Sequence, residues 1–118
     1  MAIPRIVPYL VGDLDAVKRF YTGVLGLEVA MDGADFLGLR SPDNPSAQLV
    51  ASAPGVEEPV PSLGIDVGDP EAVDAAHAAV LAQGLEVVYP RTDEPWGIYR
   101  FFVRDPTGAV ISVLAHRV

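Results

Sequence analysis

The chain has 118 residues, half of them apolar, and no cysteine. This length suffices for one domain with a hydrophobic core, and the lack of cysteine excludes disulfides, thiolate nucleophiles and cysteine-ligated zinc. A formal net charge of −8 disfavours a phosphate backbone, so no nucleic acid partner is expected. No segment approaches the ~18 apolar residues of a membrane span, and the N-terminus lacks a secretion signal. We therefore expect a cytoplasmic protein with no membrane partner.

The first half of the sequence recurs in the second half. The segment VGDLDAV (residues 11–17) returns as VGDPEAV (residues 67–73), and GLEV returns in the same order. The offset is 56 between Val11 and Val67, and it grows to 64 between Arg40 and Arg104. Two units of this length are longer and fewer than solenoid repeats. The repeat predicts a single domain of paired modules, covering about residues 1–53 and 62–118, with a linker at residues 54–61.

Each module begins with an apolar run followed by a helix start signal. The runs Ile6–Val11 and Ser62–Val67 are predicted strands. An aspartate then has the chemistry of a helix N-cap, and a later glycine ends the helix. These cap and stop residues are Asp13 and Gly26 in the first module and Asp69 and Gly84 in the second. Apolar residues at helical spacing predict the buried stripes: Leu14, Val17, Tyr21, Val24 and Leu25, then Val73, Ala76, Val80 and Leu81.

Three further strands are predicted in each module. They are Leu27–Met31, Phe36–Arg40 and Ala47–Ala51 in the first module, then Leu85–Tyr89, Ile98–Arg104 and Val110–Ala115 in the second. The order is βαβββ, twice. This pattern predicts the α+β class.

The repeat and several short motifs together resemble the vicinal oxygen chelate superfamily. The motifs are Val11-x-Asp13-Leu14 with Phe20-Tyr21, Pro95-Trp96-Gly97 with Arg100-Phe101, and Asp105-Pro106-x-Gly108. That superfamily includes glyoxalase I, extradiol dioxygenases, fosfomycin-resistance thiol transferases and bleomycin-resistance proteins, and Pro-Trp-Gly is most similar to the last branch. The resemblance implies two βαβββ modules in an open, cup-shaped mixed sheet. It also implies a homodimer with ligand crevices between subunits, and the linker permits modules to pair within one chain or to exchange between chains.

The resemblance further implies a divalent metal held by His, Glu or Gln at four strand positions. Those positions here hold Ile6, Gln48, Ser62 and Ser112, of which only Gln48 is a plausible ligand. Neighbours on the same strand face offer no ligand either: Pro4, Pro8, Val50, Gly64, Val110 and Leu114. We therefore predict no metal, no cofactor and no catalytic residue. His77 is expected to pack within the second helix, and His116 to lie in a mobile tail, so no Ser-His-acid constellation is supported.

Strand alternation in the resembled fold predicts which residues face the cup. The expected cup residues are Pro8, Leu10, Phe36, Arg40, Val50, Asp66, Arg100, Phe102, Arg104 and Leu114. The residues expected to pack against the helices are Val7, Tyr9, Leu63, Ile65, Phe101 and Val103. An apolar cup with a few charges is typical of a small-molecule pocket.

The predicted ligand-binding residues are Phe36, Gln48, Asp66, Trp96, Arg100, Phe102 and Ser112. The sole tryptophan, Trp96, either stacks on a flat or cationic ligand or caps the sheet edge. Phe36 and Phe102 either line the pocket or fill it. Asp66 either meets a ligand cation or forms an internal pair with Arg100 or Arg104.

Three functions are consistent with these predictions. The first is a metal-independent protein that sequesters a small cationic or aromatic compound, as bleomycin-resistance proteins do. The second is an enzyme: either a glyoxalase-like isomerase or lyase or a dioxygenase with an atypical metal site, or a metal-free lyase. The third is a module with a vestigial cup that binds another protein.

Overall fold

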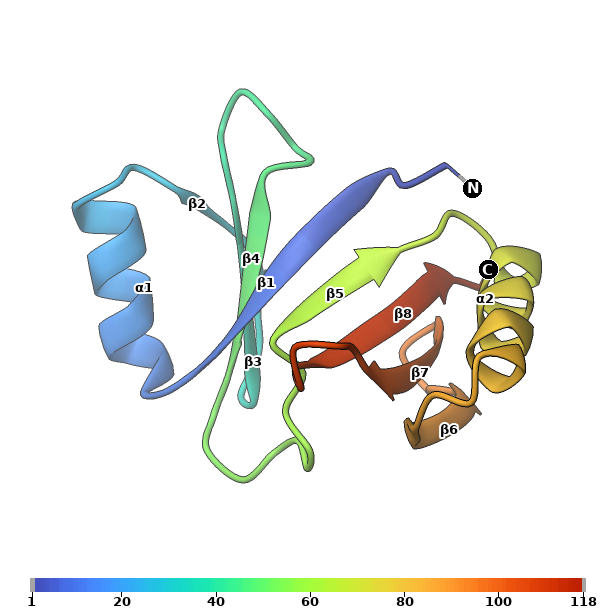
Figure 1. The fold of residues 1–118 in the computed structure, drawn as a ribbon. Coiled ribbons are helices and arrows are strands. Elements are labelled where there is room, and N and C mark those ends of the chain that lie inside the picture. The colour runs from blue at the N-terminus through green and yellow to red at the C-terminus, as the bar shows by residue number, and fades with distance from the viewer. Residues whose placement is uncertain (1, 118) are drawn as a thin grey trace. The chain divides into compact units, whose positions relative to one another are not determined.

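The protein forms two compact units in the computed structural model, which describes residues 2–117. Residues 6–60 form the first unit, called module 1, and residues 61–117 form the second with residues 2–5, called module 2. Each module follows the order βαβββ (Figure 1). No helix among the described residues has the length and apolar character needed to cross a membrane.

Module 1 is a mixed sheet with one helix in its described residues. Its strand order is β2-β3-β4-β1, with β1 parallel to β4 and the other neighbours antiparallel. The elements are β1 (Arg5–Val11), α1 (Leu14–Gly23), β2 (Glu28–Asp32), β3 (Phe36–Arg40) and β4 (Gln48–Ser52).

Module 2 repeats this arrangement. Its strand order is β5-β8-β7-β6, with β5 parallel to β8 and the other neighbours antiparallel. The elements are β5 (Leu63–Asp66), α2 (Pro70–Ala82), β6 (Val87–Asp93), β7 (Ile98–Arg104) and β8 (Val110–His116). The predicted α+β class with two βαβββ modules is confirmed.

The helix start and stop signals act as predicted. The Asp13 carboxylate accepts a hydrogen bond from the Ala16 amide at 3.1 Å, and Asp69 accepts from Ala72 at 2.8 Å. These bonds satisfy amides that lack a partner in the first helical turn. Gly26 and Gly84 take φ of +74° and +67°, a left-handed conformation that costs glycine little.

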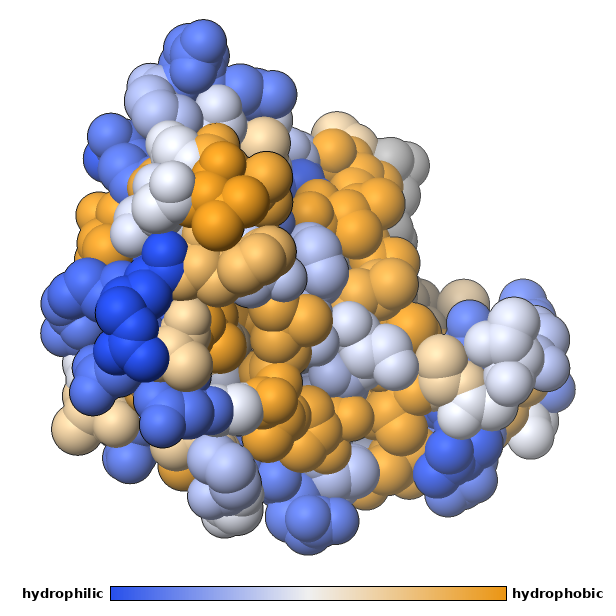
Figure 2. Space-filling model, turned by 90° about the vertical axis from the view of Figure 1, so that its left-hand side faces the viewer, coloured by the Kyte–Doolittle hydropathy of each residue, from blue (hydrophilic) through white to orange (hydrophobic). Residues whose placement is uncertain are grey.

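The apolar stripe of α1 is shorter than predicted. Leu14, Val17 and Tyr21 pack against the buried side chains Leu37, Leu39 and Ala51. Val24 and Leu25 are instead 65% and 61% exposed, because α1 ends at Gly23 and helical spacing no longer applies beyond it. In α2, Leu81 is 59% exposed because it lies about 100° around the helix from Val80. Figure 2 views the side of the molecule that carries α1 and shows apolar side chains gathered on that surface.

The core of module 2 lies between its sheet and α2. Phe101 is fully buried at its centre, and the His77 ring meets the Phe101 ring edge-on at a centroid distance of 5.1 Å. The buried cluster comprises Val67, Val73, Tyr99, Phe101, Val103, Ile111, Val113 and Ala115. Leu63 and Ile65 pack against the same cluster. The predicted helix-facing residues of module 2 and the packed position of His77 are thus confirmed.

The predicted orientation of β1 is wrong. Leu10 pairs with Ala51 and packs in the α1-side cluster, whereas it was expected to face away from the helix. Tyr9 pairs with Val50, so these two side chains share the opposite face. The repeat aligns Leu10 with Asp66 and Val50 with Leu114. In module 2, however, Asp66 pairs with Leu114, whereas in module 1 Val50 pairs with Tyr9. The β1 register therefore differs by one residue from that of β5, and such a shift exchanges the two faces of a strand.

A tyrosine–aspartate pair ties β7 to α2. The Tyr99 hydroxyl donates to the Asp74 carboxylate at 2.5 Å, and Arg91 donates to the same oxygen at 2.9 Å. The hydrogen bond from Tyr99, with that from Arg91, lowers the pKa of Asp74. The hydrogen bond to Asp74, together with burial, raises the pKa of Tyr99 above 10.0.

We expect Tyr99 to ionise at higher pH than a tyrosine in an unfolded chain. The folded state holds the Tyr99 proton more tightly than the unfolded chain does, and this difference stabilises the fold. The stabilisation is complete below about pH 10 and is lost as the pH rises further. Phenolate absorbance during a pH titration measures the ionisation. Tyr99→Phe should remove the group that ionises at high pH. Asp74→Asn should lower the pH at which Tyr99 is half ionised. A group that still ionises at high pH in Tyr99→Phe would contradict this assignment.

Candidate ligand-binding site

One face of the module 2 sheet carries buried polar residues. We call it the polar face and define it by Asp66, Arg100, Phe102, Ser112 and Leu114. Strand register places these side chains together, because Asp66 pairs with Leu114, Leu114 with Arg100, and Ser112 with Phe102. All five are less than 10% exposed, although they lie on the sheet face opposite α2. The predicted grouping of these residues on one face is confirmed.

Asp66 forms a buried ion pair at one end of this face. Its Oδ2 accepts from Arg5 Nε at 3.0 Å, and its Oδ1 accepts from the Gly68 amide at 2.9 Å. The predicted pairing with Arg100 or Arg104 is therefore wrong. Arg104 instead pairs with Glu86 at 3.3 Å. Arg5 lies 61 residues before Asp66, and no local pattern in the sequence marks that long-range contact.

His116 also differs from its prediction. It is the last residue of β8, and its Nε2 lies 2.6 Å from Nη2 of Arg5. A guanidinium group can only donate, so His116 Nε2 is the acceptor in this contact. His116 thus belongs to the sheet, which extends one residue beyond the predicted strand end.

Arg100 lies in a cage of aromatic rings closed by a carboxylate. Its Nη2 and Nε atoms donate to Glu94 Oε2 at 2.7 and 3.1 Å. The two side chains are only 11% and 7% exposed. The guanidinium carbon lies 4.8 Å from the ring centre of Phe102, 5.3 Å from that of Trp96 and 5.5 Å from that of Tyr89. We call Tyr89, Glu94, Trp96 and Phe102 the cage.

The side chains of the cage also contact one another. The Tyr89 hydroxyl donates to Glu94 Oε1 at 3.0 Å, and the rings of Tyr89 and Phe102 lie 4.8 Å apart. Sequence reasoning missed Tyr89 and Glu94, because β6 was predicted to end at Tyr89. The strand continues to Asp93 through Pro90, which an edge strand tolerates. The only signal for Glu94 was its position directly before Pro95-Trp96-Gly97.

Trp96 lies in the turn between β6 and β7 and is 57% exposed. Gly97 permits this turn with φ of +86°, and its amide donates to the Glu94 carbonyl at 3.1 Å. The indole therefore combines two properties, since it covers the buried Arg100 and also presents a large aromatic surface to solvent. Such an arrangement suits stacking of a flat molecule.

The remaining predicted site residues, Phe36 and Gln48, belong to module 1. Both side chains lie on the sheet face opposite the Leu37 and Leu39 side chains, because Phe36 and Arg40 alternate with those leucines and Arg40 pairs with Gln48. Phe36 is half-buried. The Gln48 amide nitrogen donates to the Pro45 carbonyl at 2.6 Å.

The residues at the four implied metal positions do not fit a divalent ion. Ile6 carries no donor atom, and Ser62 is exposed and precedes β5. The Ser112 hydroxyl is fully buried and has no hydrogen-bond partner among the described residues. Across residues 2–117, no group of three or more His, Cys, Asp or Glu side chains is arranged to hold a metal ion. A divalent site needs several such donors in a fixed geometry.

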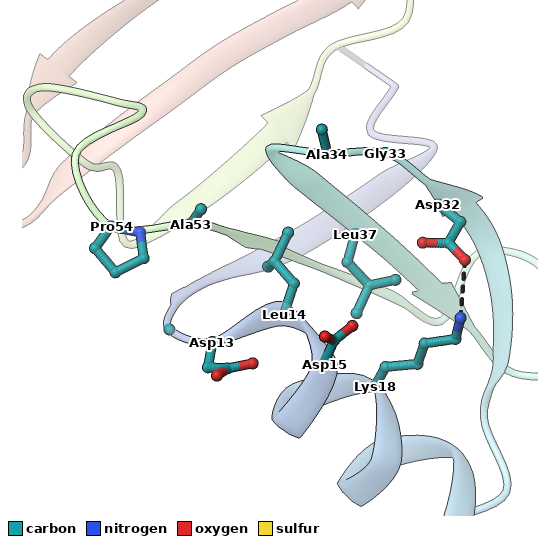
Figure 3. A pocket seen from close by; sticks show the side chains of 11 residues that line it. Asp13, Leu14, Asp15, Lys18, Asp32, Gly33, Ala34, Leu37, Ala53 and Pro54 are labelled. Atoms are coloured by element: carbon teal, nitrogen blue, oxygen red, sulfur yellow. Dashed lines mark hydrogen bonds and ion pairs between the residues drawn. The ribbon is translucent and has the colours of Figure 1, made fainter.

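A separate open pocket of about 340 Å³ lies within module 1. It is formed by the start of α1, the turn between β2 and β3, and the end of β4, with Leu37 among the lining side chains. Figure 3 shows Lys18 reaching from α1 to Asp32, and the Nζ to Oδ2 distance is 2.8 Å. The hydrogen bond to Asp32 raises the pKa of Lys18. No predicted site residue lines this pocket.

The fold is shared with several solved structures. A superfamily member from Vibrio splendidus 12B01 is 17% identical with a TM-score of 0.67, covering 97% of this chain and 99% of that one. Methylmalonyl-CoA epimerase from Mycobacterium tuberculosis is 20% identical with a TM-score of 0.74, and the match covers 98% of this chain and 88% of that one. A variant of homoprotocatechuate 2,3-dioxygenase from B. fuscum is 27% identical with a TM-score of 0.71, covering 98% of this chain but only 34% of that one.

Sequence comparison gives the family directly. No curated protein matches the chain. The profile described as "Glyoxalase/Bleomycin resistance protein/Dioxygenase superfamily" matches residues 2–113, which is nearly the whole sequence. This match agrees with the βαβββ repeat and with the structural neighbours. The chain therefore belongs to the glyoxalase/bleomycin resistance protein/dioxygenase superfamily.

Proposed function

We propose that this protein binds a small aromatic compound without a metal ion, and that it acts by sequestration as bleomycin-resistance proteins do. The observation that carries the proposal is the exposed indole of Trp96 directly over the buried Arg100. Glu94 holds Arg100, so the indole of Trp96 lies on an ordered surface before a ligand arrives. The poor metal donors at the four implied positions support a role in binding rather than metal catalysis.

The test is a binding measurement on the intact protein. Titration calorimetry and Trp96 fluorescence would be followed with a bleomycin-type glycopeptide, a mitomycin-like quinone and a cationic aromatic dye. We expect saturable binding of at least one compound, quenching of the fluorescence and a loss of about fivefold in affinity in Trp96→Ala, because an aromatic contact contributes about 1 kcal/mol. Light scattering should give the mass of a homodimer.

A matched control is Phe20→Ala, which removes a half-exposed aromatic ring from module 1 and should leave affinity unchanged. Equal losses in both variants would contradict a role for Trp96. The absence of binding to every compound would remove the sequestration function.

A second candidate is a metal-dependent enzyme with an atypical site. It is favoured by the 27% identity to a dioxygenase, although this chain spans about a third of that protein's length. Elemental analysis after purification without chelators distinguishes the candidates. About one transition-metal ion per chain would favour the enzyme, whereas binding that survives chelator treatment unchanged would favour sequestration.

A further inference from the structure

The cage around Arg100 has the composition of a binding site for an organic cation. Three aromatic rings face the guanidinium at 4.8 to 5.5 Å, and a carboxylate that is only 7% exposed neutralises it. Aromatic faces and a desolvated carboxylate are the groups that recognise guanidinium and ammonium ligands. The protein's own side chain occupies this site.

The cage does not depend on Arg100 for its arrangement. Glu94 presents Oε2 to Arg100, while its other oxygen is fixed by the Tyr89 hydroxyl. The Tyr89 ring is in turn placed against Phe102, and these residues pair across β6 and β7. A carboxylate and two rings would therefore stay in position if the Arg100 side chain withdrew.

An incoming cation would leave the charge of the cage unchanged. The buried Glu94 carboxylate needs a positive partner, because an unpaired buried charge is costly. A ligand guanidinium supplies the same charge and the same planar donors as Arg100. Trp96, at 57% exposure, forms the solvent side of the cage. The net charge of −8 would favour the approach of a cation.

We propose that the cage of Tyr89, Glu94, Trp96 and Phe102 binds the guanidinium or ammonium group of an aromatic ligand in exchange for Arg100. This inference rests on the proposed function and specifies the class of ligand. Arg100 then competes with the ligand for the cage. Because a tethered competitor acts at an effective concentration on the order of millimolar, the wild-type protein binds such ligands more weakly than a protein without it.

The experiment compares benzylguanidinium with benzylurea, a neutral compound of nearly the same shape. Calorimetry would be performed on the wild type, on Arg100→Ala and on Arg100→Gln, after circular dichroism has established which variants are folded. We expect the folded variants to bind benzylguanidinium at least tenfold more tightly than the wild type, with no such gain for benzylurea. Glu94→Gln combined with Arg100→Ala should abolish the gain.

A second measurement uses only the wild-type protein. The Nε–H resonance of Arg100 should shift in nitrogen–proton correlation spectra when benzylguanidinium saturates the site, because Arg100 leaves Glu94. If Trp96 fluorescence reports ligand binding while this resonance stays unchanged and folded variants gain no affinity, the exchange is overturned and the proposed function stands. If no aromatic compound binds the wild type or its variants, both are overturned.

Discussion

Replacing Phe101 by alanine is expected to lower the free energy of unfolding of module 2 by about 3 to 5 kcal/mol. Phe101 is fully buried at the centre of β7, between Val113 of β8 and the His77 ring of α2. The substitution removes a large apolar contact and leaves a cavity that neighbouring strands cannot close. Urea unfolding followed by Trp96 fluorescence measures this effect, since the only tryptophan lies in module 2.

The matched control is Leu81→Ala on α2 of the same module. Leu81 is 59% exposed, so its truncation should change the free energy of unfolding by no more than about 0.5 kcal/mol. Equal effects of the two substitutions would mean that the face of β7 carrying Phe101 is not the core of the module.

Replacing Glu94 by glutamine is expected to cost module 2 about 3 kcal/mol, although the two side chains have nearly the same shape. The change removes the negative charge that Glu94 presents to the buried Arg100 guanidinium, because both donor contacts of Arg100 to Glu94 end on a carboxylate oxygen. The cost reflects the loss of a charge–charge interaction between side chains that are 11% and 7% exposed, where solvent screens little. Urea unfolding and the melting temperature both measure it.

A second ion pair of β7 shows whether the cost depends on burial. Arg104 pairs with Glu86 at 3.3 Å, but these side chains are 43% and 63% exposed. Glu86→Gln should therefore cost no more than about 1 kcal/mol, since solvent screens an exposed pair. Similar losses at Glu86 and Glu94 would indicate that burial does not strengthen the requirement for a counter-charge.

Much of the fold could be predicted because it depends on local signals. Asp13 and Asp69 are helix caps that act through hydrogen bonds three residues away, and Gly26 adopts a backbone conformation that favours glycine. The alternation on β7 fixed the two faces of the module 2 sheet, so Phe101 and Arg100 were assigned correctly. The ends of elements were less predictable. Val24 and Leu25 continue the helical spacing in sequence, but the helix has already ended.

The candidate site was only partly predictable, for a physical reason. Asp66 and Arg100 were identified as charged residues on one face, but their counter-charges come from distant or irregular backbone. Arg5 reaches Asp66 from the start of β1, and Glu94 follows a strand whose register shifts near Tyr89 and Thr92. A bulge of this kind redirects side chains without a characteristic sequence. Partner choice among buried charges therefore required three-dimensional positions.

The register of β1 has a consequence for how the two modules have diverged. Where module 2 carries the acid Asp66, module 1 carries Leu10, and the shifted pairing turns that leucine toward its own helix. An apolar side chain gains from packing against the helix, whereas a carboxylate at this partly buried place would lose part of its hydration. The two modules therefore present different chemistry at this strand position, and only module 2 has a buried acid there.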